Sequence, residues 1–130
     1  MTEKTNDSMG MKVLLVLNKR RNLDLLRNIF ESKDHEVIIA ENGVEAMETA
    51  AAFSPHLILL DVLLPGIDGL DTCRQLKKDG KTKNIPVIFL TAKTGQEYII
   101  EAFEIGGVDY ISEPFHQAEV LAKSGVHLKP

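Results

Sequence analysis

The sequence predicts an α/β domain, a doubly wound five-stranded parallel sheet with helices on both faces. Five short segments rich in Val, Ile and Leu alternate along the chain with segments that carry apolar residues at helical spacing. The first, third and fourth of the short segments are continuously apolar, as strands are when helices cover both faces of a parallel sheet. Strands that alternate with helices form βαβ units, and these units make the strands parallel.

Each element can be placed in order from its apolar residues and from the residues that flank it. The expected strands cover residues 12–17, 36–40, 56–61, 86–91 and 108–111. The expected buried residues of the first four helices are Leu23, Leu26, Ile29 and Phe30, then Val44, Met47 and Ala51, then Leu70, Cys73 and Leu76, then Ile99, Ala102 and Phe103. Ser54 and Pro55 are expected to end the second helix, Asp68 to cap the third, and Gly106 with Gly107 to end the fourth. A fifth helix is expected after the last strand.

Length and composition indicate one domain with a short tail. The 130 residues are enough for one hydrophobic core, so we assign residues 11–130 to the domain and residues 1–10 to a disordered tail. The net charge of −4 gives no reason to expect nucleic acid or an anionic membrane as a direct partner. No apolar run approaches the roughly 18 residues of a membrane span, and the N-terminus lacks the apolar core of a signal peptide. We therefore expect a cytoplasmic protein.

The residues that can carry chemistry follow the ends of the expected strands. Asp61 ends the third strand and Thr91 the fourth, while residues 19–22 follow the first and Glu113 follows the fifth. In a doubly wound sheet the ligand site lies outside the carboxyl ends of the strands, where the strand order reverses. Asp61 is therefore expected at the mouth of the sheet and not in its core, where an unpaired carboxylate would be costly.

Three stretches resemble the receiver domain of two-component response regulators: LILLDVLLPGIDGLDTCRQLK, IPVIFLTAK and GGVDYISEPF. The resemblance extends over about residues 11–128 and implies the flavodoxin-like strand order 2-1-3-4-5. It also implies that Asp61 is the phosphoacceptor, which takes a phosphoryl group from a histidine kinase or phosphotransfer protein. Thr91 would close on the phosphoryl oxygen, Tyr110 would move inward with it, and the backbone carbonyl of Leu63 would be a metal ligand.

The same resemblance implies how such a domain passes its signal on. The partner would be a downstream effector protein or domain, bound at the surface formed by the fourth helix, fifth strand and fifth helix, and a homodimer through that face is a further arrangement. Tyr98 and Ile99 are candidate contacts at this surface. Tyr98 is expected to point sideways or outward, because Ile99, Ala102 and Phe103 already supply the buried side of the fourth helix. No enzymatic activity of the domain itself is expected.

Two departures from the receiver pattern affect the expected phosphorylation site. Receivers hold Mg²⁺ with two acidic residues after the first strand, where this chain has Leu17 and Asn18. Mg²⁺ at phosphoryl sites is usually held by one or two carboxylates, so Asp61 with Asn18 would bind it weakly or not at all. Receivers also carry a lysine where this chain has Glu113. A like charge at about 4 Å from a phosphoryl group costs on the order of 1–4 kcal/mol.

Two arrangements would compensate for these losses. In the first, Glu113 serves as a displaced metal ligand and Lys93 contacts the phosphate. In the second, Lys19 or Arg20 pairs permanently with Asp61. We favour the second, because the cations and Asp61 leave adjacent strand ends and an opposite charge lowers the pKa of a carboxylate. A third interpretation, that these cations simply point into water, stays open because runs of charge are usually solvated.

The sequence therefore favours a receiver domain with weak or phosphorylation-independent signalling through protein contacts. The alternative is a flavodoxin-like flavin-binding domain, which needs a phosphate cradle of small or hydroxylated residues after the first strand. The loop NKRRN offers charge but no such cradle, and a colourless purified protein would dismiss this alternative. A phosphohydrolase with a nucleophilic aspartate would carry a second Asp two residues after Asp61, where Leu63 stands.

Overall fold

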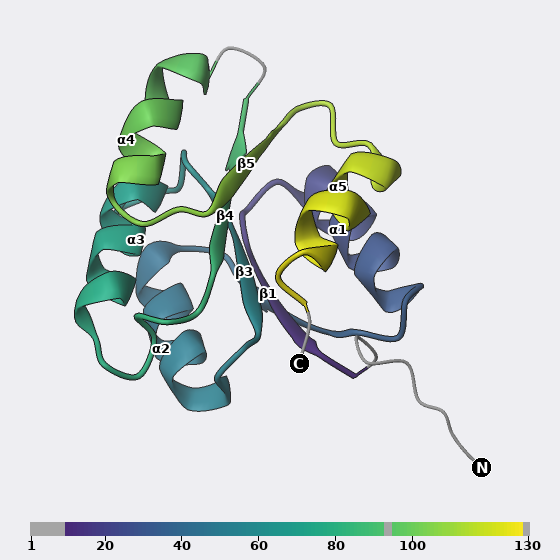
Figure 1. Ribbon diagram of the computed structural model, residues 1–130, viewed down its shortest axis with the longest axis horizontal. Helices are drawn as coiled ribbons and strands as arrows, with labels where there is room; N and C mark the ends of the chain where they lie inside the picture. The colour runs from purple at the N-terminus through teal and green to yellow at the C-terminus, as the bar shows by residue number, and fades with distance from the viewer. Residues whose placement is uncertain (1–9, 93–94, 129–130) are drawn as a thin grey trace.

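A parallel sheet of five strands in the order β2-β1-β3-β4-β5 forms the centre of the molecule (Figure 1). The computed structural model describes residues 10–92 and 95–128. The strands are β1 (Lys12–Val16), β2 (Glu36–Ala40), β3 (Leu57–Asp61), β4 (Val87–Thr91) and β5 (Asp109–Ser112). The predicted fold class, strand order and parallel pairing are confirmed.

Helices cover both faces of this sheet. They are α1 (Arg20–Glu31), α2 (Gly43–Phe53), α3 (Gly69–Lys78), α4 (Ile99–Glu104) and α5 (Gln117–Gly125), with a short 3₁₀ helix η1 (Gly95–Tyr98) before α4. Figure 1 shows α1 and α5 on one face and α2, α3 and α4 on the other. No helix within the described residues is long and apolar enough to cross a bilayer.

The apolar runs of the strands fill two cores, one on each face of the sheet. Side chains alternate along β1, so that Val13 and Leu15 contribute to the core under α1 and α5 while Leu14 and Val16 contribute to the other. The continuous apolar runs predicted for β1, β3 and β4 are thus explained by burial on both sides.

The predicted helix boundaries are confirmed by the capping geometry. The Asp68 side chain accepts a hydrogen bond from the Asp71 amide at 2.8 Å and caps α3. α2 ends at Phe53, and the next residue, Ser54, turns the chain with φ +48°. Gly106, two residues after the end of α4, has φ +114°, which a residue with a side chain rarely adopts.

Two residues predicted to face the core are exposed instead. Val44 is 50% exposed, because the buried side of α2 is formed by the smaller Gly43, Ala46 and Ala50. A Cβ atom at Gly43 would lie 2.2 Å from Thr72 Oγ1 of α3, so α2 can approach α3 only with small residues on this side. Phe103 of α4 is 46% exposed. The periodicity of the sequence favoured the larger apolar residues and missed this close helix contact.

Candidate functional site

The carboxyl ends of β1, β3, β4 and β5 bring the candidate residues to one edge of the sheet. Asp61 at the end of β3 lies opposite Leu90 of β4, and Thr91 lies opposite Ser112 of β5. The Glu113 amide donates to the Thr91 carbonyl oxygen at 2.9 Å. The structure therefore brings Asp61, Thr91 and Glu113 to the same edge, although the sequence separates them by up to 52 residues (113 minus 61).

Asp61 is half-buried at the end of β3. Its Oδ1 atom accepts a hydrogen bond from the Leu63 amide at 3.0 Å. Val16 pairs with Leu60 in the register of β1 and β3, so Leu17, the next residue, lies beside Asp61. Burial raises the pKa of the Asp61 carboxyl from 3.8 to about 6, against the lowering effects of the Leu63 hydrogen bond and the Lys19 charge. The Glu113 charge raises this pKa further.

Asp61→Asn should therefore raise the free energy of unfolding by about 1–2 kcal/mol at neutral pH in EDTA, because it removes a charge that is only partly solvated. The folded pKa lies above the unfolded value, so protonated Asp61 stabilises the fold at low pH, and this contribution is lost as the pH rises through about 6. Urea denaturation at several pH values measures the difference, which should shrink as the pH falls below about 6. Asp24→Asn, at an exposed position of α1, is the control and should change stability by less than about 0.5 kcal/mol. An equal gain in both variants would contradict the prediction.

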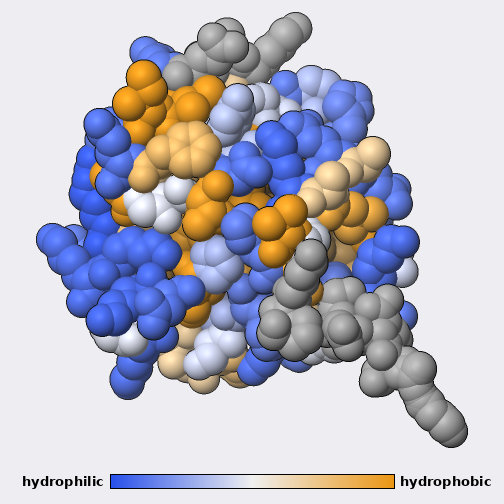
Figure 2. Space-filling model, viewed as in Figure 1, coloured by the Kyte–Doolittle hydropathy of each residue, from blue (hydrophilic) through white to orange (hydrophobic). Residues whose placement is uncertain are grey.

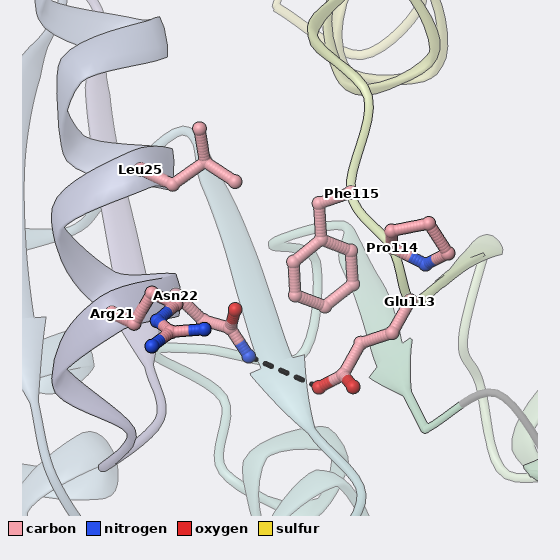
Figure 3. Close-up of a pocket in the computed structure, with 6 residues that line it drawn as sticks. All are labelled: Arg21, Asn22, Leu25, Glu113, Pro114 and Phe115. Carbon is pink, nitrogen blue, oxygen red and sulfur yellow. Dashed lines mark hydrogen bonds between the residues drawn. The ribbon is translucent and has the colours of Figure 1, made fainter.

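Glu113, and not Asp61, is the ion-pair partner of Lys19 in the described part of the chain. Lys19 Nζ lies 3.7 Å from Glu113 Oε2, and Asn22 Nδ2 donates to the same oxygen at 3.0 Å. Figure 3 shows Asn22 reaching from α1 toward Glu113 in the turn after β5. Within the described residues, no ion pair joins Lys19 or Arg20 to Asp61. The prediction of a permanent pair between these residues is therefore wrong. The Glu113 side chain is 32% exposed, so pairing its carboxylate requires only partial desolvation.

The two positions of the missing acidic pair differ sharply in their surroundings. Leu17 is 1% exposed and belongs to the core under α1 and α5, whereas Asn18 is exposed. Within the described residues, no three His, Cys, Asp or Glu side chains come together in a way that could hold a metal ion. Asp61 with the Asn18 side-chain amide and the Leu63 carbonyl would offer Mg²⁺ a single carboxylate, the lower end of the one or two that hold it at phosphoryl sites.

Thr91 and Tyr110 occupy neighbouring strands near this edge. Thr91 is 3% exposed, and its hydroxyl donates to the Ser112 hydroxyl at 3.2 Å. Tyr110 is half-buried on β5, with its ring edge-on to that of Phe103 at 6.2 Å and the Lys123 ammonium 4.7 Å from its ring centre. The sequence interpretation missed Ser112 and Lys123. Ser112 could have been found from the strand period, because it lies two residues after Tyr110 on the same face.

A family model described as the response regulator receiver domain matches residues 13–124. The chain belongs to this family. Among its relatives, the transcriptional regulatory protein ResD of Bacillus subtilis is 37% identical over 121 residues, which cover 93% of this chain and 48% of ResD. This receiver domain spans a quarter to about half of the length of the curated relatives it matches.

Solved structures of receiver proteins share its fold. A putative response regulator from Chloroflexus aurantiacus superimposes with a TM-score of 0.88 at 30% identity, over 92% of this chain and 98% of that one. The receiver domain of the sensor histidine kinase PA1611 from Pseudomonas aeruginosa gives a TM-score of 0.84 at 26% identity, with the same coverage of 92% and 98%. That structure has a magnesium ion coordinated in its active site cleft.

The candidate partner surface of this receiver domain is formed differently from the sequence expectation. Tyr98 and Ile99 are both half-buried, and Tyr98 packs against the core on the α2, α3 and α4 face. The outward side of α4 is instead made by Ile100, which is 73% exposed, and by Phe103. Figure 2 shows apolar side chains gathered over the region of α4. Lys93, the expected phosphate contact, lies outside the described residues.

An open groove of about 400 Å³ lies between α1 and the turn that follows β5 (Figure 3). Its lining residues are Arg21, Asn22, Leu25, Glu113, Pro114 and Phe115. The groove combines the apolar Leu25 and Phe115 side chains with the charges of Arg21 and Glu113, and it adjoins the edge where Asp61 lies. No sequence pattern indicated it, because its two walls are far apart in the chain.

Proposed function

We propose that this receiver domain signals through protein–protein contacts that depend weakly or not at all on phosphorylation of Asp61. Asp61 stands where the resemblance to receivers places the phosphoacceptor, so the carboxylate that such a transfer needs is present. The observation that carries the proposal is the burial of Leu17 beside Asp61, at a position where receivers place a metal-binding acid.

The electrostatics of the site support this proposal. A transferred phosphoryl group carries negative charge, and catalysis of the transfer depends on cations or donors that stabilise this charge. Here Glu113 adds negative charge near Asp61, and it also draws Lys19 toward itself. A carboxyl group with a pKa of about 6 is in addition partly protonated in mildly acidic solution, which removes the nucleophilic form.

We propose two partner sites for this domain. The exposed apolar residues Ile100 and Phe103 on α4, beside Tyr98 and Ile99, would contact a downstream effector or a second copy of the chain. The groove lined by Leu25 and its neighbours would receive a histidine kinase or phosphotransfer protein, since it adjoins the Asp61 edge of the sheet.

We predict that Mg²⁺ binds this domain at least tenfold more weakly than it binds a variant in which the acidic pair is restored, a deficit of about 1.4 kcal/mol or more. The reason is that Leu17 and Asn18 stand at the positions of the acidic pair, and no three His, Cys, Asp or Glu side chains of the described residues come together to hold a metal ion. Isothermal titration calorimetry of the parent and of Leu17→Asp/Asn18→Asp/Glu113→Lys would measure the two affinities. Equal, tight binding by both proteins would contradict the prediction.

The test of the proposed function compares amide NMR spectra of the parent and of Asp61→Asn, each with and without acetyl phosphate in the presence of Mg²⁺. We expect acetyl phosphate to leave the signals of Thr91, Tyr110 and α4 in place in the parent, as it does in Asp61→Asn. A control with acetate and inorganic phosphate accounts for changes caused by the ions alone. A donor-dependent shift of these signals in the parent, and its absence in Asp61→Asn, would overturn the proposal.

A further inference from the structure

Lys123 of α5 makes several contacts with the residues around Tyr110. Its Nζ atom donates to the Tyr110 carbonyl oxygen at 2.7 Å and lies 4.7 Å from the centre of the Tyr110 ring. The same ammonium pairs with Glu119 at 3.0 Å and with Asp109 at 3.8 Å. Glu119 lies one turn earlier on α5, so it holds the lysine from the helix side while Asp109 holds it from the strand side.

The other side of the Tyr110 ring is held by α4. The Phe103 ring meets it edge-on, with 6.2 Å between ring centres and an angle of 86° between the ring planes. β5 is the edge strand next to β4. The helices α4 and α5 flank it from opposite faces of the sheet (Figure 1). The Tyr110 side chain is therefore fixed by one helix from each face.

Among the described residues, the Thr91 hydroxyl is hydrogen-bonded to Ser112 and not to Tyr110. The Thr91 hydroxyl donates to Ser112, its register partner on β5. Tyr110 lies one step further from the site on the same face of β5, opposite Phe89. A change in the orientation of the Tyr110 ring would alter its contacts with both the Lys123 ammonium and the Phe103 ring.

We propose that Lys123 is a positioning residue that clamps Tyr110 in its present orientation and so couples α5 to the candidate switch. The inference rests on the proposed role of Tyr110 as a switch residue, and it adds a device that biases this switch when Asp61 is not phosphorylated. A cation over an aromatic ring at a partly exposed site favours the contact by about two- to fivefold in population. Loss of the ammonium should therefore free the ring to sample other orientations.

The chain suits a direct spectroscopic test because it has two tyrosines and no tryptophan. Labelling with 3-fluorotyrosine gives one ¹⁹F signal for each tyrosine, and Tyr98→Phe assigns them. Lys123→Met keeps the aliphatic stem of the lysine and removes the ammonium. Lys78→Met, at an exposed position near the end of α3, is the matched control. Lys123→Arg restores a cation.

We expect Lys123→Met to shift and broaden the Tyr110 signal and to leave the Tyr98 signal in place, which also shows that the fold is intact. Lys78→Met should change neither signal, and Lys123→Arg should bring the Tyr110 signal back toward its parent position. In the parent, nuclear Overhauser contacts between the Tyr110 ring and the Lys123 methylenes give a measurement that needs no variant. An unchanged Tyr110 signal in Lys123→Met, or the absence of those contacts in the parent, would overturn the proposal.

The same measurements repeated in the Asp61→Asn background separate this inference from the proposed function. Phosphorylation of Asp61 cannot occur there, so a response of Tyr110 to Lys123→Met reports on the clamp alone. A clamp that is present in both backgrounds supports the inference whether or not the parent responds to acetyl phosphate. A Tyr110 signal that is insensitive to Lys123 in both backgrounds overturns the clamp and leaves the proposed function to its own test.

Discussion

Leu17→Asp combined with Asn18→Asp and Glu113→Lys should lower the free energy of unfolding by about 3–5 kcal/mol in EDTA. The main cause is Leu17, which is 1% exposed and packs in the core with Leu23 and Leu26. The substitution removes a buried leucine and places a carboxylate beside Asp61, whose own pKa burial already raises. Urea denaturation measures the loss.

Mg²⁺ should restore part of this stability in the triple variant and have little effect on the parent. A ligand that binds only the folded state at ten times its Kd adds about 1.4 kcal/mol. Glu113→Lys alone is the matched control, because it changes the charge of the turn after β5 and leaves the Leu17 packing intact. A triple variant as stable as the parent in EDTA would contradict the placement of Leu17 in the core, and one that does not respond to Mg²⁺ would show that the acidic pair is not what the site lacks.

Gly69→Ala should lower the free energy of unfolding by about 3 kcal/mol. Gly69 is the first residue of α3, and its amide donates to the Val62 carbonyl oxygen at 2.8 Å. An added Cβ atom would lie 2.0 Å from the Asp61 carbonyl oxygen and 2.8 Å from Val62 Cα. Both obstacles are backbone atoms of the segment that carries the phosphoacceptor position, so the segment or the start of α3 has to move.

Gly80→Ala is the matched control for this prediction, because an added Cβ atom there has no neighbour within 4 Å. It should change the free energy of unfolding by less than about 0.5 kcal/mol. Chemical shifts of the Asp61 and Leu63 amides would report whether Gly69→Ala also displaces the loop after β3. If both alanine variants unfold at the same urea concentration as the parent, α3 does not approach β3 as closely as the structure indicates.

The strands and helix ends could be predicted from the sequence because each depends on neighbouring residues. The apolar runs of β1, β3 and β4 identify strands buried on both faces, and the Asp68 cap needs only the amide three residues later. The buried side of α2 could not be predicted in the same way. It depends on how closely α3 approaches Gly43, which is a property of two helices and not of one.

In the candidate site, too, some features could be predicted from the sequence and others could not. Asp61 could be placed at the edge of the sheet because strand ends in a parallel sheet share one side. The partner of Lys19 could not be predicted, since the choice between Asp61 and Glu113 depends on distances across three strands and on the cost of desolvation. The Lys123 contacts with Tyr110 were missed for a related reason, because 13 residues and the turn before α5 separate the two.

The most direct test of the account is the intact mass of the protein after treatment with acetyl phosphate, with and without Mg²⁺. The account predicts that the parent gains little or no phosphoryl mass in either condition, whereas Leu17→Asp/Asn18→Asp/Glu113→Lys gains one phosphoryl group only with Mg²⁺. Adding Asp61→Asn to the triple variant should abolish that gain. Complete, Mg²⁺-dependent phosphorylation of the parent at Asp61 would contradict the central claim that burial of Leu17 and the charge of Glu113 have disabled the site.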